Sequence, residues 1–220
     1  MIILNYSKSQ HKEIIHACVL ALKSGKVVAY PTDTSYGLAV DASNFKAVKK
    51  LYNVKERGFK KAVHVVVPSK AYGKRLVGWN KEAEKLSVKF WPGPLTLVLR
   101  SKNKEFRNEI LNILTAKSGF LGLRMPNNRI ALGLAKALGR PITATSANPS
   151  ALLSGGYDSY SAEDVYKQFR VKKFQPDIII NAGKLLKRKP STLVKLEKNN
   201  FEILRKGPVS EKEIKKILFK

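Results

Sequence analysis

Short apolar segments alternate with amphipathic ones along the chain, and this alternation is the strongest constraint on its fold. The strand-like segments are 26–30, 62–67, 95–101, 119–124, 141–146 and 177–181. The helix-like segments are 9–24, 44–54, 81–90, 128–138, 161–169 and 210–219. Short β-branched runs between turn residues are typical of buried strands, and an apolar period near 3.6 residues is typical of helices. The order predicts a single α/β domain, in which helices flank one twisted mixed β-sheet.

Several segment ends carry boundary signals. Four helix-like segments begin with a predicted N-cap, at Ser9, Asn44, Ser161 and Ser210. Segment 191–205 predicts a β-hairpin that turns at Asn199-Asn200. A hairpin makes the sheet mixed, with long loops gathered on one side. A doubly wound Rossmann sheet is the alternative, which the absence of a GxGxxG motif after any strand weakens.

The charge of the chain favours a polyanionic partner. Its 220 residues include 42 Lys plus Arg against 16 Asp plus Glu, a formal net charge of +26. Such an excess favours nucleotides or nucleic acid as ligands, although a lysine-rich surface that only aids solubility has the same composition. The single cysteine, Cys18, excludes a disulfide framework. No secretion signal or long apolar run is present, so a cytoplasmic protein without a membrane partner is expected.

Three loops rich in hydroxyl groups begin or end predicted strands. They are PTDTSYG (31–37), TATSANPSALLSGG (143–156) and KPST (189–192). Hydroxyl and backbone N–H groups bind phosphates and small zwitterions because they donate hydrogen bonds without a competing charge. An ordinary turn is the alternative for the first loop. Arginines at neighbouring segment ends can add charge-assisted bonds to phosphate or carboxylate.

Other familiar sites are not indicated. The three histidines are too scattered for a metal site, and no GxSxG motif or P-loop is present. No carboxylate pair suggests acid–base chemistry, so the catalytic residues stay unassigned. The site is predicted to bind and align anions, without a metal held by protein side chains alone.

Seven motifs occur in an order that resembles the YrdC-like family of threonylcarbamoyl-AMP synthases. They are PTDTSYGL (31–38), KERGFKK (55–61), FWPGPLTLVL (90–99), LRMP (123–126), TSANPS (145–150), STLVKL (191–196) and ILRKG (203–207). The resemblance covers nearly the whole chain. It implies one YrdC-like domain over 9–220 with a concave basic cavity, without the second C-terminal domain of longer members.

The resemblance also implies a nucleotidyltransferase reaction. L-threonine, bicarbonate and ATP, with Mg²⁺ accompanying the ATP, would give threonylcarbamoyl-AMP and pyrophosphate. A partner transferase would then use this product to modify an adenosine beside the anticodon of certain tRNAs. Two alternatives stay open: a carbamoyl-adenylate-forming relative with another substrate, and a non-catalytic protein of the same fold that binds tRNA or double-stranded RNA.

The family pattern implies roles for particular residues. The implied ATP-binding residues are Lys55, Arg57, Lys61, Ser146, Ser154 and Arg205. The implied L-threonine-binding residues are Thr34, His64, Arg124 and Ser191. Further residues of the possible site are Thr32, Tyr36, Ala144 and Asn148.

The sequence departs from the family pattern at several places. Ungapped counting puts Val66 where the family has a histidine near threonine, whereas His64 lies two residues earlier. Residues 64 and 66 share one face of a strand, so either a displaced histidine or a short gap would restore the contact. Ala151, residues 188–190 and Lys206 also depart from the pattern, and the resemblance implies that these positions lie around the nucleotide cavity.

Overall fold

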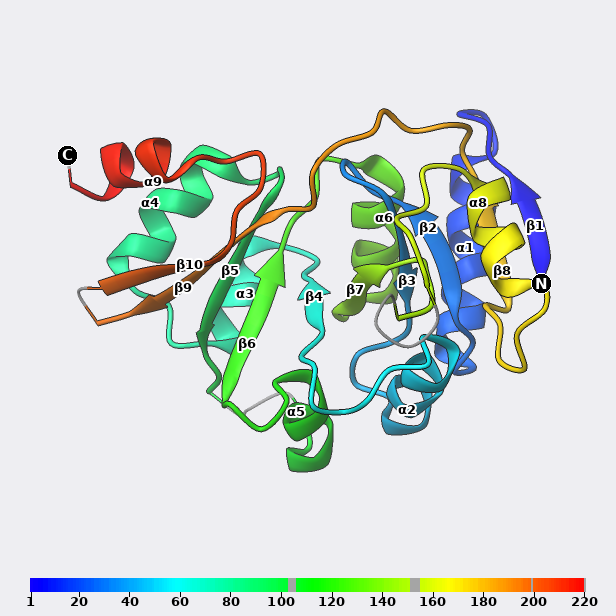
Figure 1. Cartoon of the computed structure of the whole chain (residues 1–220), viewed down its shortest axis with the longest axis horizontal. Coiled ribbons are helices and arrows are strands. Elements are labelled where there is room, and N and C mark those ends of the chain that lie inside the picture. The colour runs from blue at the N-terminus through cyan, green and yellow to red at the C-terminus, as the bar shows by residue number, and fades with distance from the viewer. Residues whose placement is uncertain (103–105, 151–154, 199, 220) are drawn as a thin grey trace.

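The computed structural model describes residues 1–102, 106–150, 155–198 and 200–219. In this part of the chain, ten strands form one sheet with helices on both faces (Figure 1). The strands are β1 (Ile2–Asn5), β2 (Val28–Pro31), β3 (Tyr36–Ala39), β4 (His64–Val66), β5 (Leu95–Arg100), β6 (Phe120–Arg124), β7 (Ile142–Ser146), β8 (Ile178–Asn181), β9 (Thr192–Glu197) and β10 (Asn200–Arg205). The helices are α1 (His11–Lys23), α2 (Phe45–Val54), α3 (Lys70–Leu76), α4 (Lys81–Phe90), α5 (Asn108–Leu114), α6 (Arg129–Leu138), α8 (Ala162–Phe169) and α9 (Glu211–Leu218).

The sheet is mixed, as predicted. Its order is β1-β8-β2-β3-β7-β4-β6-β5-β9-β10. The β1–β8, β2–β8, β4–β6 and β5–β9 pairs are parallel, whereas the β2–β3, β3–β7, β4–β7, β5–β6 and β9–β10 pairs are antiparallel. The doubly wound alternative is therefore wrong. Strand β7 joins the two halves of the sheet, because it pairs with β3 on one side and β4 on the other.

Two apolar clusters cover the two faces of the sheet. Helices α1 and α6 pack on one face against β2, β7 and β8, with Cys18, Leu22 and Leu134 fully buried. The larger cluster on the other face takes its side chains from α2, α4, α5, α8 and α9. Burial of this apolar area is the main source of stability for the sheet.

Most of the predicted helix starts are confirmed. Asn44 caps α2, and Ser161 and Ser210 each form a capping box at the start of α8 and α9. The predicted cap of α1 is wrong: the helix begins after Gln10, and the Ser9 hydroxyl instead contacts that of Ser7 at 3.0 Å. The hairpin of β9 and β10 is also present, but Asn200, predicted to be in its turn, already pairs with Glu197 as the first residue of β10.

No helix in the described ranges is both long enough and apolar enough to cross a membrane.

Candidate functional site

A cavity of about 210 Å³ lies at the middle of the sheet, where several strands begin or end. Its walls come from the turn after β2, the start of β4, the ends of β6 and β7, and the β9–β10 hairpin. The lining residues are Tyr30, Thr32, Thr34, Ser35, Tyr36, Gly37, Arg57, Ala62, Val63, His64, Arg124, Ala144, Thr145, Ser146, Asp158, Pro190, Ser191, Leu193 and Arg205. The hydroxyl-rich loops therefore meet at one place, as their positions at strand ends predicted.

The turn between β2 and β3 forms one wall. Pro31 and Tyr36 face each other across the antiparallel pair, so the turn itself is Thr32–Ser35. The Thr32 hydroxyl accepts from the backbone N–H groups of Thr34 (3.1 Å) and Ser35 (3.3 Å) and donates to the Ser35 carbonyl at 2.7 Å. The segment is thus an ordinary turn, stabilised by a threonine at its first position, that also presents hydroxyl groups to a cavity.

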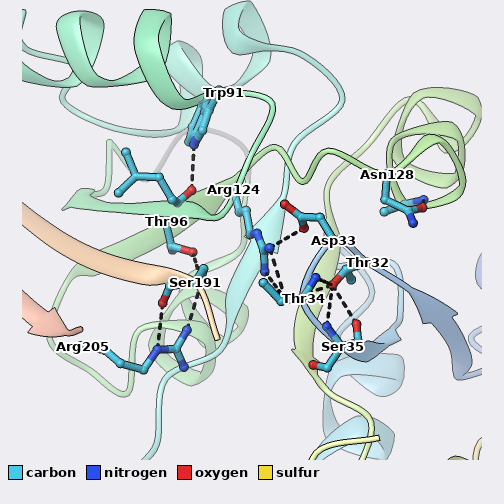
Figure 2. A network of polar contacts seen from close by, with 12 residues as sticks. Thr32, Asp33, Thr34, Ser35, Trp91, Thr96, Arg124, Asn128, Ser191 and Arg205 are labelled. Carbon is cyan, nitrogen blue, oxygen red and sulfur yellow. Dashed lines mark hydrogen bonds and ion pairs between the residues drawn. The ribbon is translucent and has the colours of Figure 1, made fainter. Parts of the chain in front are cut away.

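Arg124 is held from two sides at the end of β6 (Figure 2). Its Nη2 lies 2.5 Å from Oδ1 of Asp33, and Nη1 and Nη2 each lie 3.3 Å from the Thr34 hydroxyl. The Arg124 and Asp33 side chains are each only 6% exposed, and Arg124 Nε and Asp33 Oδ2 have no hydrogen-bond partner in the part of the chain that the structure describes. An unpaired buried N–H is costly, so a ligand with an anionic acceptor suits this wall.

A second arginine is held on the opposite wall by the hairpin. Arg205, at the end of β10, donates from Nε to the Ser191 carbonyl and from Nη2 to the Ser191 hydroxyl, both at 3.0 Å (Figure 2). The Ser191 hydroxyl also contacts that of Thr96 on β5 at 2.8 Å. Trp91 supports β5 by donating from its indole to the Leu95 carbonyl at 2.8 Å. Burial and the neighbouring Arg124 lower the pKa of Arg205.

Arg57 completes a set of three arginines around the cavity. It donates from Nη2 to the Ala62 carbonyl at 2.8 Å and from Nη1 to the Thr145 hydroxyl at 3.5 Å. Its Nε is buried and has no hydrogen-bond partner among the described residues. Among the lining residues, only Asp158 carries a carboxylate, so the cavity is positively charged.

Lys55 lies behind the loop that follows β7 and does not line the cavity. Its Nζ donates to the carbonyls of Ser146 (2.6 Å) and Asn148 (2.7 Å), and the side chain of Asn148 is bonded to the Ser146 hydroxyl. Burial, followed by the nearby charge of Arg57, lowers the pKa of Lys55 to about 7. In this structure Lys55 and Asn148 therefore shape the loop that carries Ser146.

His64 lines the cavity, whereas Val66 is fully buried in the core beneath α1 and α6. The structure therefore brings His64, and not Val66, to the wall of the cavity. A Cβ on Gly122 of the neighbouring β6 would lie 2.7 Å from the His64 Cβ. Gly122 is therefore needed for β6 to approach His64, a role that the sequence did not indicate.

Burial, followed by the charges of Arg205, Arg124 and Arg57, holds the pKa of His64 well below its ordinary value. The folded protein then keeps His64 neutral at pH values where the unfolded chain takes up a proton. Below about pH 6.5 the unfolded state binds more protons, so this histidine lowers stability as the pH falls; above pH 6.5 its contribution is constant. We expect wild type to lose ~1 kcal/mol more than His64→Gln between pH 7.5 and 5.5 in urea unfolding. Equal losses would contradict the lowered pKa.

The structure places the other predicted residues as follows. Thr32, Tyr36 and Ala144 line the cavity together with Ser146, and Lys61 is an exposed residue outside it. Ser154 lies outside the described residues. No role for Asp33, Thr96, Asp158 or Gly122 could be assigned from the sequence, because their importance comes from partners distant in the chain. Within the described ranges, no group of three His, Cys, Asp or Glu side chains could hold a metal ion.

Comparison of the sequence with known proteins identifies one family. The model of the Sua5/YciO/YrdC family, described as "Telomere recombination", matches residues 20–207. A relative from Methanocaldococcus jannaschii, provisionally named a threonylcarbamoyl-AMP synthase, is 32% identical over 207 residues, which cover 94% of this chain and 92% of the relative. The threonylcarbamoyl-AMP synthase of Pyrococcus abyssi is 32% identical over 222 residues, which cover 99% of this chain but only 61% of that protein.

Solved structures share the fold. The crystal structure of P. abyssi Sua5 complexed with L-threonine superposes with a TM-score of 0.87 at 31% identity, over 99% of this chain and 61% of that one. Escherichia coli YciO superposes with a TM-score of 0.80 at 24% identity, over 97% and 98% of the two chains. The chain thus spans the whole of a structure such as YciO, but less than two thirds of Sua5.

Proposed function

The chain belongs to the Sua5/YciO/YrdC family, and we propose that it is a threonylcarbamoyl-AMP synthase, a nucleotidyltransferase. In this reaction the amine of L-threonine and bicarbonate form a carbamate with loss of water. A carbamate oxygen then forms a bond to the α-phosphorus of ATP, and pyrophosphate leaves. The observation that carries the proposal is one cavity lined by Arg57, Arg124 and Arg205 together with the hydroxyl groups of Thr34 and Ser191.

We assign the threonine end to the wall built from Arg124. Its guanidinium binds the substrate carboxylate, since a charge-assisted bond of this kind is worth about 1.5–3 kcal/mol when shielded from water. Thr34 on the same wall and Ser191 on the opposite wall both offer hydroxyl groups to the cavity. His64 is neutral and adds an uncharged donor or acceptor to the same wall.

We assign the nucleotide end to Arg57, Arg205 and Ser146, with Lys55 acting on the loop behind them and Lys61 and Ser154 as predicted further contacts. Guanidinium groups stabilise the charge that develops on a transferring phosphoryl group and on leaving pyrophosphate. We expect rate acceleration to come from alignment and charge neutralisation rather than from a protein nucleophile. Mg²⁺ enters with ATP, whose phosphates supply its ligands.

The product is a reactive mixed anhydride of a carbamate and AMP. A transferase that modifies tRNA is the class of partner that consumes it, as the family resemblance implies. We further propose that residues 9–220 act as one catalytic domain in the cytoplasm.

The test measures pyrophosphate released from ATP, Mg²⁺ and bicarbonate, with and without L-threonine, with mass spectrometry of the nucleotide product. We expect a threonine-dependent adenylate of the mass of threonylcarbamoyl-AMP. Ser191→Ala should reduce kcat/KM for threonine about tenfold, because the substitution removes the Ser191 hydroxyl, which we assign to threonine binding. Ser87→Ala is the matched control, since Ser87 is equally buried but bonds only within α4, to the Glu84 carbonyl.

Other outcomes separate the alternatives. An adenylate formed with another amino acid, or with carbamoyl phosphate, would mean that the departures around 188–190 have changed the substrate. Binding of double-stranded RNA with a steep salt dependence, unaffected by Ser191→Ala and without any adenylate, would favour the non-catalytic RNA-binding reading suggested by the net charge of +26.

A further inference from the structure

Asp33 contacts Arg124 from outside the ligand cavity. The carboxylate does not line the central cavity but a second one of about 290 Å³ on the far side of the turn, together with Pro92, Asn128 and Arg188. In Figure 2, the Asp33 side chain lies between the Arg124 guanidinium and Asn128. A ligand in the central cavity therefore meets Arg124, and Arg124 meets Asp33.

This contact fixes the orientation of the guanidinium. Nη2 is shared between Asp33 and the Thr34 hydroxyl, and Nη1 bonds the same hydroxyl. A planar guanidinium that is held along one edge presents its remaining N–H groups in one direction. Pre-organisation of this kind lowers the entropy that must be lost when a ligand carboxylate binds.

Asp33 also affects the charge at the cavity. Arg57, Arg124 and Arg205 line it with one carboxylate, that of Asp158, among the described residues, and Asp33 adds a negative charge in direct contact with one of these arginines, Arg124. Both side chains of the Asp33–Arg124 pair are only 6% exposed, so solvent screens the pair little. Without Asp33, the same walls would attract inorganic polyanions more strongly.

We propose that Asp33 is a positioning and specificity-determining residue, which holds Arg124 for the single carboxylate of an amino acid and limits the affinity of the cavity for pyrophosphate. The proposal rests on the proposed function. It predicts two opposite effects of one substitution: weaker binding of threonine, because Arg124 is no longer fixed, and tighter binding of pyrophosphate, because the cavity gains positive charge.

The experiment compares wild type with Asp33→Asn, Asp33→Glu and Asp41→Asn. Asp41 is the matched control, because it is another buried aspartate paired with an arginine (Arg140, 3.0 Å) and lies outside the cavity. For Asp33→Asn we expect KM for threonine to rise about tenfold, KM for ATP to change less than about twofold, and the inhibition constant of pyrophosphate to fall about threefold. Asp33→Glu keeps the charge, so it should raise KM for threonine and leave pyrophosphate inhibition unchanged. Asp41→Asn should change none of these constants.

The proposal is overturned if folded Asp33→Asn keeps the wild-type KM for threonine and pyrophosphate inhibition. It is also overturned if all constants worsen together, as for a purely structural residue. If wild type forms no threonine-dependent adenylate, the proposed function fails, and calorimetric titration with pyrophosphate alone tests this inference: tighter binding to Asp33→Asn supports the charge role, and equal binding overturns it. If Asp33→Asn does not fold, the KM of Asp33→Glu for threonine decides. A raised KM supports the proposal, and a wild-type KM overturns it.

Discussion

Arg124→Met is expected to destabilise the protein by ~3–5 kcal/mol and to remove threonine-dependent pyrophosphate release. The substitution leaves Asp33, only 6% exposed, as an uncompensated buried charge, and breaking one side of a buried ion pair has costs of this size. It also removes the guanidinium to which we assign the substrate carboxylate, so affinity for threonine should fall about ten- to a hundredfold. Urea unfolding and calorimetric titration with threonine measure the two effects separately.

The double variant Asp33→Asn/Arg124→Met separates folding from binding. Asparagine removes the buried charge, so roughly half of the lost stability should return, while threonine affinity stays low. If Arg124→Met alone keeps wild-type stability, the pair is not buried as described. If the double variant binds threonine like wild type, Arg124 is not the carboxylate ligand.

Gly207→Ala is expected to disturb the opposite wall. A Cβ on Gly207 would lie 2.4 Å from the Pro190 carbonyl oxygen and 2.5 Å from the Thr192 backbone nitrogen, so the added atom must push two backbone segments apart. The segment that moves carries Ser191, whose carbonyl and hydroxyl hold Arg205. We expect a loss of about 1–3 kcal/mol in unfolding free energy and a fall of about tenfold or more in kcat/KM for ATP.

Gly78→Ala is the control for this prediction. The nearest atom to its added Cβ, the Arg100 carbonyl oxygen, would be 3.7 Å away, an ordinary contact. It should therefore change stability by less than about 0.5 kcal/mol and leave activity unchanged. A Gly207→Ala protein as stable and active as Gly78→Ala would mean that the hairpin does not depend on this close approach.

Much of the fold could be predicted because its signals are local. Apolar periodicity placed α4 and α6 within a residue of their observed bounds, and the caps Asn44, Ser161 and Ser210 are local hydrogen bonds. Strand β3 was not predicted, because hydroxyl residues precede it and a glycine interrupts it. Gly37 is needed there, since a Cβ would lie 3.2 Å from the Thr145 carbonyl oxygen of β7. Segments β1, α3 and α5 were also missed.

The site was less predictable, because its contacts are between distant parts of the chain. The hydroxyl-rich loops and the arginines could be recognised from their residue types. Ten of the fourteen residues that the family resemblance implied for the site line the cavity. The pairing of Asp33 with Arg124, 91 residues apart, depends on the strand order between β3 and β6. The position of Lys55 behind the loop depends in the same way on Asn148, 93 residues later.

The strand order also has a consequence for how the chain folds. The Arg124–Thr34 and Ser191–Thr96 contacts close loops of 90 and 95 residues. Contacts so distant in sequence make folding slow, because the chain loses the entropy of large loops before the contacts form. During synthesis, the wall built from Arg124 can form once Arg124 and β7 have left the ribosome. The opposite wall, which contains Arg205, must wait until that residue has been synthesised. The nascent chain therefore passes through a stage with an open, half-built cavity, in which unpaired strand edges are exposed to aggregation.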